Sequence, residues 1–199
     1  MRLYRFFHQL FFILSCVFLT STISGSEQQT SKLYFSPDDH LAERLVALIE
    51  KEQKSIHVAV YCLSHHGIAE ALIQAKKRGV DVEVIVDPFS VKARFPLVRL
   101  ARSGIPVYVW NPIVDPKKGQ RVPLMHDKFC VFGKTSVWTG SFNFTYEADT
   151  NNRENALFLE DPELARRFLE QFRTMKNRGC SRYEEYLAAH PKPKKSKNL

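Results

Sequence analysis

The sequence predicts an α/β fold in which a mixed, largely parallel β-sheet is sandwiched between helices. The chain has 199 residues, of which 44% are hydrophobic, so it can bury one substantial core. Between residues 33 and 110, β-rich runs alternate with amphipathic runs, and this alternation is typical of parallel strands joined by helices. A hairpin, a further strand and a long helix follow, which makes the predicted sheet mixed.

The first half of the chain predicts four strands separated by three helices. A short strand at 33–35 leads to a helix whose candidate N-cap is Ser36, because a serine hydroxyl accepts a hydrogen bond from the first turn. Pro96 interrupts the third helical run. The segments after the first helix are the strand 55–63, the helix 67–79, the strand 80–87, the helix 90–104 and the strand 105–110.

The second half predicts a loop, a hairpin, a strand and a helix. Gly133-Lys134 joins two β-rich runs and favours a two-residue turn with glycine first. These segments are the proline-rich loop 111–123, the hairpin strands 126–132 and 135–140, the strand 153–160 and the amphipathic helix 161–179.

Two terminal segments flank the folded domain, which we predict over residues 33–177. Residues 1–25 place two arginines before an apolar run, which is typical of a signal peptide and also compatible with an N-terminal anchor. A cleaved signal predicts a periplasmic or secreted protein, and a retained one predicts a membrane-anchored protein. Residues 181–199 are predicted to form a basic C-terminal tail, either solvated or acting as an electrostatic tether.

The charge balance is basic, with 29 Lys and Arg residues against 21 Asp and Glu residues. A positive field attracts polyanions such as nucleic acid or anionic lipid, and it does not choose between them. In the proline-rich loop, Lys117, Lys118 and Arg121 are either solvated or in contact with a phosphate backbone.

One stretch carries residues that suit phosphate chemistry. His126 and Lys128 differ by two, so in an extended strand their side chains leave the same face. Lys128 supplies a cation, and the Ser141 hydroxyl and Asn143 amide follow in a turn, a set that suits a tetrahedral anion. A histidine beside such a set can act as a nucleophile or as an acid and base.

His126-x-Lys128 followed by Gly140-Ser141-x-Asn143 resembles the HKD motif of the phospholipase D superfamily. Residues 36–87 resemble the first half of its short, single-motif members, the bacterial endonuclease-like and mitochondrial cardiolipin hydrolase-like ones. Residues 151–161 resemble the segment that supplies an acidic residue to the site. The resemblance implies a phospholipase D-like fold with one motif per chain.

The resemblance also implies a two-step transfer that needs no metal or other cofactor. His126 would attack phosphorus to form a phosphohistidine, which water then resolves. Lys128 and Asn143 would neutralise the nonbridging oxygens, with Ser141 assisting, and Glu154 would hold the imidazole in the required tautomer. Because a second histidine must protonate the leaving oxygen and the chain has one motif, the resemblance implies a homodimer.

One position departs from the family pattern. Gly133 stands where the aspartate of the motif is expected, five residues after Lys128. Glycine has no carboxylate, so either the site is retained and Gly133 serves the hairpin turn, or the domain is weakened and only binds phosphate polymers.

The sequence therefore predicts a metal-independent phosphodiesterase, and more specifically a non-specific endonuclease that cleaves DNA or RNA. A phospholipase D-type hydrolase of cardiolipin or phosphatidyl lipids is the first alternative, with residues 1–25 as a possible link to a membrane. An inactive nucleic-acid-binding domain is the second, motivated by Gly133.

Several other residues draw attention. Asp87 ends a predicted parallel strand, at the edge where α/β sites gather. Cys62 and His65 have the spacing of a metal-ligand pair, but two further ligands at suitable spacing are missing, so His65 and His66 are expected in a solvated loop or at the substrate entrance. The residues expected to serve packing are His57, Cys130, Trp110 and Trp138.

Overall fold

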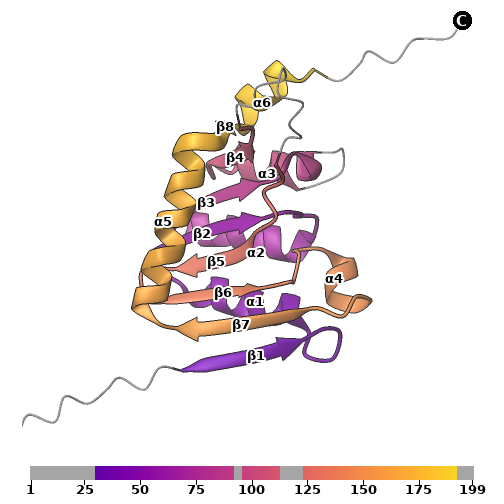
Figure 1. The fold of residues 1–199 in the computed structure, drawn as a ribbon, viewed down its shortest axis with the longest axis vertical. Coiled ribbons are helices and arrows are strands. Elements are labelled where there is room, and N and C mark those ends of the chain that lie inside the picture. Colours follow the sequence, from indigo (N-terminus) through magenta and orange to yellow (C-terminus); the bar gives the residue numbers. More distant parts are fainter. Residues whose placement is uncertain (1–29, 92–95, 113–122, 192–199) are drawn as a thin grey trace, which may run out of the picture.

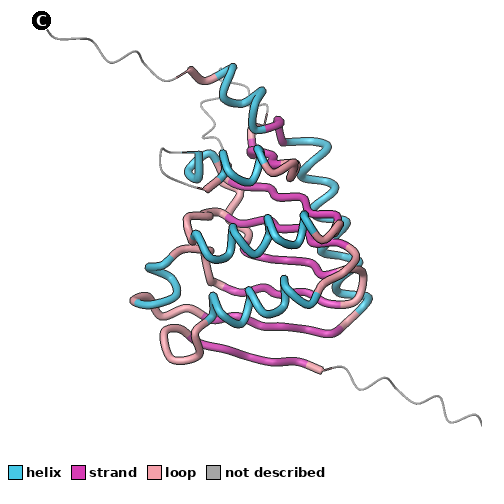
Figure 2. The backbone as a smooth tube through the Cα atoms, turned by 180° about the vertical axis from the view of Figure 1, so that it is seen from behind, coloured by secondary structure: helices cyan, strands magenta, loops and turns pink. Residues whose placement is uncertain are grey.

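A computed structural model of the chain describes residues 30–91, 96–112 and 123–191. These residues form one eight-stranded sheet with helices on both faces (Figure 1). Helix α5 (Pro162–Gly179) crosses one face, and α1 (Leu41–Lys51) and α2 (His66–Lys77) cover the other, which Figure 2 shows from behind. The predicted α/β fold is confirmed.

The predicted strands and helices occur in the predicted order as far as residue 179, and the short helix at Tyr146–Thr150 was not predicted. The strands are β1 (Ser31–Phe35), β2 (Ser55–Val60), β3 (Asp81–Val86), β4 (Val107–Trp110), β5 (Lys128–Phe132), β6 (Ser136–Gly140), β7 (Asn155–Glu160) and β8 (Cys180–Arg182). The helices are α1 (Leu41–Lys51), α2 (His66–Lys77), the 3-10 helix η1 (Pro88–Val91), α3 (Leu97–Arg102), α4 (Tyr146–Thr150), α5 (Pro162–Gly179) and α6 (Tyr183–Ala189).

The sheet has the strand order β1-β7-β6-β5-β2-β3-β4-β8. Among the described strands, β2 pairs in parallel with β3 and β3 with β4, and the other neighbours are antiparallel. The sheet is mixed as predicted, but the expectation of a largely parallel one is wrong. The reason is that β5 returns beside β2 in the opposite direction, and β6 and β7 then follow as successive antiparallel neighbours.

Apolar side chains on the two faces of the sheet form two cores. In β5, Cys130 lies in the core beneath α1 and α2, whereas Phe129 lies in the core beneath α5, because successive strand residues point to opposite faces. We call the core beneath α1 and α2 the first core, and Trp138 is buried in it. Trp110 donates its indole N–H to the carbonyl of Pro123 at 2.8 Å. The expected packing roles of Cys130 and Trp138 are confirmed, and Trp110 is partly buried against the core beneath α5.

Two helix starts differ from the prediction. Helix α1 begins at Leu41, and the Asp149 carboxylate accepts a hydrogen bond at 2.8 Å from the N–H of Ala42, so Ser36 is not its cap. A carboxylate from the distant helix α4 thus satisfies a free N–H of the first turn. Pro96 immediately precedes α3 and does not interrupt a helix, since proline is tolerated at a helix start.

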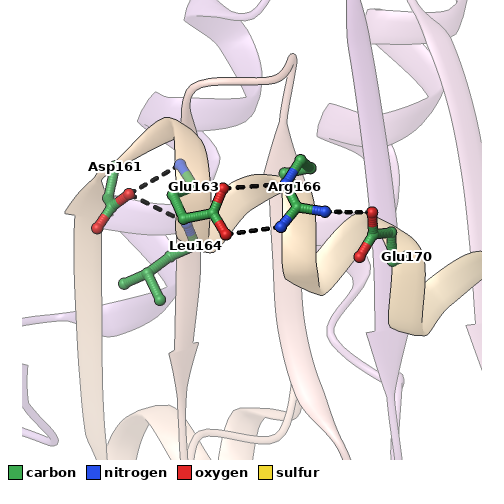
Figure 3. Close-up of polar contacts among 5 residues, drawn as sticks. All are labelled: Asp161, Glu163, Leu164, Arg166 and Glu170. Atoms are coloured by element: carbon green, nitrogen blue, oxygen red, sulfur yellow. Dashed lines mark hydrogen bonds and ion pairs between the residues drawn. The ribbon is translucent and has the colours of Figure 1, made fainter.

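Helix α5 confirms the predicted amphipathic segment, and its first turns are shown in Figure 3. Asp161 is the N-cap: its carboxylate accepts hydrogen bonds from the N–H groups of Glu163 (2.9 Å) and Leu164 (3.0 Å). On the exposed face, Arg166 bridges Glu163 and Glu170, one turn before and after it. Exposed pairs of this kind contribute little to stability, so the cap and the buried face define the helix.

The folded part extends beyond the predicted boundary at residue 177. β8 pairs with β4, and α6 packs Tyr183 into the first core, so the expectation that a tail begins at 181 is wrong for residues 181–189. An edge strand and a buried aromatic residue hold this segment.

Three predicted features lie outside the described residues: the signal or anchor at 1–25, the basic loop residues Lys117, Lys118 and Arg121, and residues 192–199 of the tail. None of the described helices has the length and apolar character needed to cross a membrane.

Gly133 lies at the opposite end of β5 from His126: the five residue steps from Lys128 to Gly133 alone span roughly 16 Å along the strand, and His126 lies two residues before Lys128. Its φ of 58° suits the turn, which spans three residues and not the two predicted, because Phe132 pairs with Ser136. A side chain at Gly133 would meet the Glu52 carboxylate, whose two oxygens lie 3.6 Å from an ideal Cβ. The position of the missing aspartate therefore lies at the far end of β5, away from the residues around His126.

We expect Gly133→Asp to destabilise the protein. It combines a left-handed backbone with a second carboxylate facing Glu52, which lowers the free energy of unfolding by on the order of 1–2 kcal/mol. Urea unfolding of Gly133→Asp and Gly133→Asn measures this, since asparagine tolerates the same φ without the charge. Adding Glu52→Gln should reduce the difference in unfolding free energy between Gly133→Asp and Gly133→Asn. A Gly133→Asp protein more stable than the wild type would contradict the prediction.

Candidate active site

The predicted site residues gather at one edge of the sheet, where the parallel strands end. Lys128 is the first residue of β5 and pairs with Val60, the last residue of β2. His126 lies just before β5, Ser141 just after β6, and Glu154 just before β7. Strands that alternate in direction thus bring residues far apart in sequence to the carboxyl edge of β2 and β3, where α/β proteins place their sites.

His126 and Lys128 are in direct contact. The Lys128 ammonium lies 2.9 Å from Nδ1 of His126 and donates a hydrogen bond at 2.7 Å to the carbonyl of the same residue. An ammonium can only donate, so Nδ1 accepts and the ring proton is on Nε2. Lys128 is only 8% exposed, and burial lowers its pKa while the nearby Asp127 and Glu154 carboxylates oppose the shift. His126, in contrast, is exposed.

Glu154 is held by the turn after β6. The Ser141 hydroxyl donates to one Glu154 oxygen at 2.5 Å and accepts the N–H of Asn155 at 3.0 Å, and the Asn152 amide donates to the other oxygen at 3.2 Å. The expected hydrogen bond between Glu154 and the imidazole is not formed. Nδ1 of His126 instead lies beside the Lys128 ammonium. Because this ammonium is buried, its N–H donors need acceptors within the protein, and Nδ1 is one of them.

Ser36 holds the main chain on both sides of Glu154. Its buried hydroxyl donates to the carbonyl of Asn152 at 2.9 Å and accepts the N–H of Glu154 at 3.0 Å, and its own N–H donates to the carbonyl of Glu154 at 3.1 Å. The serine predicted to cap α1 therefore positions an acidic residue of the site. Its sequence separation of more than 100 residues from Asn152 hid this contact from pattern analysis.

Gly140 is required by close backbone approach. A Cβ at this position would lie 2.2 Å from the carbonyl oxygen of Asn155 in β7, closer than any side chain permits. The same carbonyl accepts the N–H of Ser141 at 3.0 Å. Glycine therefore lets β6 turn into Ser141 while remaining paired with β7.

Asn143 lies in a loop that docks on the end of β2. Phe144 donates its N–H to the carbonyl of Cys62 and accepts from the N–H groups of Ser64 and His65, at 2.9–3.0 Å. The side-chain oxygen of Asn143 is buried without a hydrogen-bond partner. A buried amide oxygen without a partner is costly, and such groups concentrate at functional sites.

Two further residues support His126. The Asp87 carboxylate, 3% exposed, accepts the N–H of Met125 at 3.0 Å and so fixes the residue before His126. Tyr61 donates its N–H to the carbonyl of Asp127 at 2.9 Å, and its ring lies 4.6 Å from the His126 ring. Asp87 was a candidate from its place at a strand end. Tyr61 was missed, although it directly follows β2 and the same rule applied to it.

Of the other predicted candidates, His65 and His57 have structural contacts, and His66 is the exposed first residue of α2. His65 caps α2 by accepting the N–H of Ile68 at 3.2 Å, and its ring lies 4.0 Å from that of Tyr146. His57 packs edge-on against Phe172 as expected, and burial lowers the pKa of both histidines. Within the described ranges, no group of three or more His, Cys, Asp or Glu side chains could hold a metal ion.

The arrangement can perform chemistry on a phosphate ester. It offers an exposed imidazole, a buried ammonium beside it and a carboxylate fixed through a serine. The cation attracts and neutralises an anionic phosphate, and the imidazole can exchange a proton or form a bond to phosphorus.

Comparison with known proteins agrees with this arrangement. The family described as "Cardiolipin synthase, PLD-like domain" matches residues 45–176. "Phospholipase D" of Rickettsia prowazekii is 34% identical over 76% of this chain and 70% of its own length, and the "Mitochondrial cardiolipin hydrolase" of Mus musculus is 33% identical over 65% and 55%. The crystal structure of Nuc from Salmonella typhimurium, a phospholipase D family member, is 32% identical with a TM-score of 0.68, over 78% of this chain and 99% of Nuc.

The matched segment contains all five predicted site residues, and the fold agrees with a solved member along nearly its whole length. The chain therefore belongs to the phospholipase D superfamily and is a phosphodiesterase of that family.

Proposed function

We propose that this protein is a metal-independent endonuclease that cleaves DNA or RNA without sequence preference, through a phosphohistidine on His126. The contact between the buried Lys128 ammonium and the exposed His126 imidazole carries this proposal. The formal net charge of +8 supports a polyanionic substrate. The match to nearly the whole length of the bacterial protein Nuc supports a compact enzyme of this kind.

In the first step, Nε2 of His126 attacks phosphorus, and a P–N bond forms as the bond to the leaving oxygen breaks. Nε2 needs a free lone pair for this attack, so the exposed ring first changes tautomer: the Nε2 proton passes to water, and water supplies a proton to Nδ1. Lys128 then turns its donor from Nδ1 to a nonbridging oxygen, where it and the Asn143 amide offset the growing charge. Ser141 acts by holding the Glu154 carboxylate, which then accepts a hydrogen bond from the Nδ1–H group of His126.

In the second step, water attacks the phosphohistidine, the P–N bond breaks and His126 is regenerated. A second imidazole protonates the leaving oxygen in the first step and removes the proton from water in the second. Each chain carries the motif once, so the second imidazole is His126 of a partner copy in a homodimer. Leu124, 63% exposed and two residues before His126, supplies apolar surface where such an isologous contact would form.

The first alternative is a lipid phosphodiesterase. Its support is the names of two relatives, phospholipase D and mitochondrial cardiolipin hydrolase, and the exposed Leu124 beside His126. The second alternative, an inactive nucleic-acid binder, rested on Gly133, and the far-edge position of that residue weakens it. For location, we propose the periplasm or secretion, with membrane anchoring through residues 1–25 as the alternative.

We expect the purified protein to cut plasmid, single-stranded DNA or RNA in the presence of a chelator. His126→Asn should lower the rate by on the order of a thousandfold or more, because it removes the nucleophile and leaves the shape of the site. Brief reaction with a labelled oligonucleotide followed by denaturation should leave the label on His126. Release of headgroup from phospholipid vesicles without nucleic-acid cleavage would select the lipid alternative, and salt-sensitive binding without cleavage the inactive one.

The Lys128 ammonium must be charged to neutralise the phosphate, so kcat/KM should fall as the pH rises through its pKa. Burial lowers that pKa, so the alkaline limb should lie below the ordinary lysine value of about 10.4. Lys128→Arg should be slower and should shift the limb upward, because arginine stays charged. A pH profile of kcat/KM for both proteins measures this, and an unchanged alkaline limb in Lys128→Arg would contradict it.

If the active site needs both chains of a homodimer, an inactive chain should abolish the activity of the wild-type chain with which it pairs. Wild-type and His126→Asn chains are mixed in equal amounts while unfolded and are then refolded together. Only a quarter of the dimers then contain two intact copies of His126, so the mixture should show about a quarter of the activity of the same total amount of wild-type protein. Independent monomers would keep half. A mock mixture of wild-type protein with Leu33→Ser, a change on the exposed face of β1, serves as the control.

A further inference from the structure

A ladder of aromatic rings leads away from His126. Tyr61 lies against the His126 ring at 4.6 Å and stacks on Phe89, with ring centroids 5.2 Å apart and planes within 14°. The Lys128 ammonium lies 5.5 Å from the centre of the Tyr61 ring. Phe89 is 38% exposed, so the ladder begins at the proposed nucleophile and ends at the surface.

Buried hydrogen bonds fix the backbone that carries both rings. Ser90, fully buried, donates its hydroxyl to the carbonyl of Tyr61 at 3.0 Å and accepts the N–H of Leu63 at 3.1 Å. Asp87 accepts the N–H of Phe89 at 2.9 Å with the same carboxylate that holds the residue before His126. Phe89 and His126 are therefore positioned from one buried carboxylate, and the aromatic surface is preorganised relative to the reacting atom.

We infer that Tyr61 and Phe89 form a subsite for the nucleobase that flanks the scissile phosphate, which rests on the proposed nuclease function. The centroid of the Tyr61 ring lies 4.6 Å from that of His126 and 5.2 Å from that of Phe89, so Phe89 lies close to the ring that would hold the phosphate. A base has a flat π-face that stacks on an aromatic ring with about 1–3 kcal/mol per base, whereas an acyl chain or glycerol has no such face. The stack thus favours a nucleic acid over a lipid.

The subsite accepts any base, because every base has a π-face, so it gives affinity without sequence preference. A base inside a duplex is covered on both faces by its neighbours and must turn out to stack on Phe89. The subsite therefore acts on an unpaired base next to the bond that is cut.

The test uses the full chain and an oligonucleotide in which one phosphodiester stands among methylphosphonate linkages. The nucleotides on both sides of that bond either carry bases or are abasic. Wild-type protein should show a KM about tenfold lower for the base-bearing form, a difference of 1.4 kcal/mol. Phe89→Leu, which keeps the apolar contact and removes the flat ring, should bring the ratio of the two KM values close to one, while Phe89→Trp should keep or enlarge it.

Leu33→Ser on β1, at the opposite side of the sheet from β3 and η1, is the matched control and should leave the ratio unchanged. A ratio that persists in Phe89→Leu, in a protein that cuts the oligonucleotide, would overturn the subsite and leave the nuclease intact. If wild-type protein cuts neither oligonucleotide but releases headgroup from cardiolipin vesicles, both the proposed function and the subsite fall.

Discussion

The buried ammonium of Lys128 is the contact on which the rest of the site depends. A charge that is 8% exposed must find partners, and Lys128 finds them in the carbonyl and Nδ1 of His126 and in the face of the Tyr61 ring. The cation that would neutralise a phosphate therefore also fixes the imidazole that would attack it. Because Lys128 pairs with the last residue of β2, this contact is tied to the centre of the sheet.

The exposed groups of the site are held by buried ones. Asp87 fixes the main chain before His126, and Ser36 fixes it around Glu154, each through a side chain that is almost completely buried. Both clamps join segments far apart in the sequence, and neither needs to touch a substrate. This division leaves His126 open to solvent while its position is set from within the fold, which is the preorganisation that charge stabilisation in catalysis requires.

The motif itself divides into two parts on the structure. His126, Lys128, Ser141 and Glu154 converge at one edge, whereas Gly133 stands at the other end of β5 before the Glu52 carboxylate. The Glu52 carboxylate accepts the N–H groups of Gln53, Lys54 and Ser55, so a carboxylate already serves the backbone at that edge. An aspartate lost there changes the turn, and the chemical part of the motif is kept.

The sequence by itself determined the order of the longer strands and helices from β1 to α5, because local propensity and hydrophobic period act over a few residues, but it did not predict α4, β8 and α6. It also indicated His126, Lys128, Ser141 and Asn143 as a phosphate-binding set, because the first two share a face of one strand and the other two follow in a turn, whereas Glu154 was predicted from the resemblance to the phospholipase D superfamily. Only the tertiary structure decided that most strands pair antiparallel, that Ser36 holds Glu154 and not α1, and that Tyr61 and Phe89 extend from the His126 ring. These contacts join residues far apart in the chain, and their geometry depends on which strands become neighbours, which no local pattern contains.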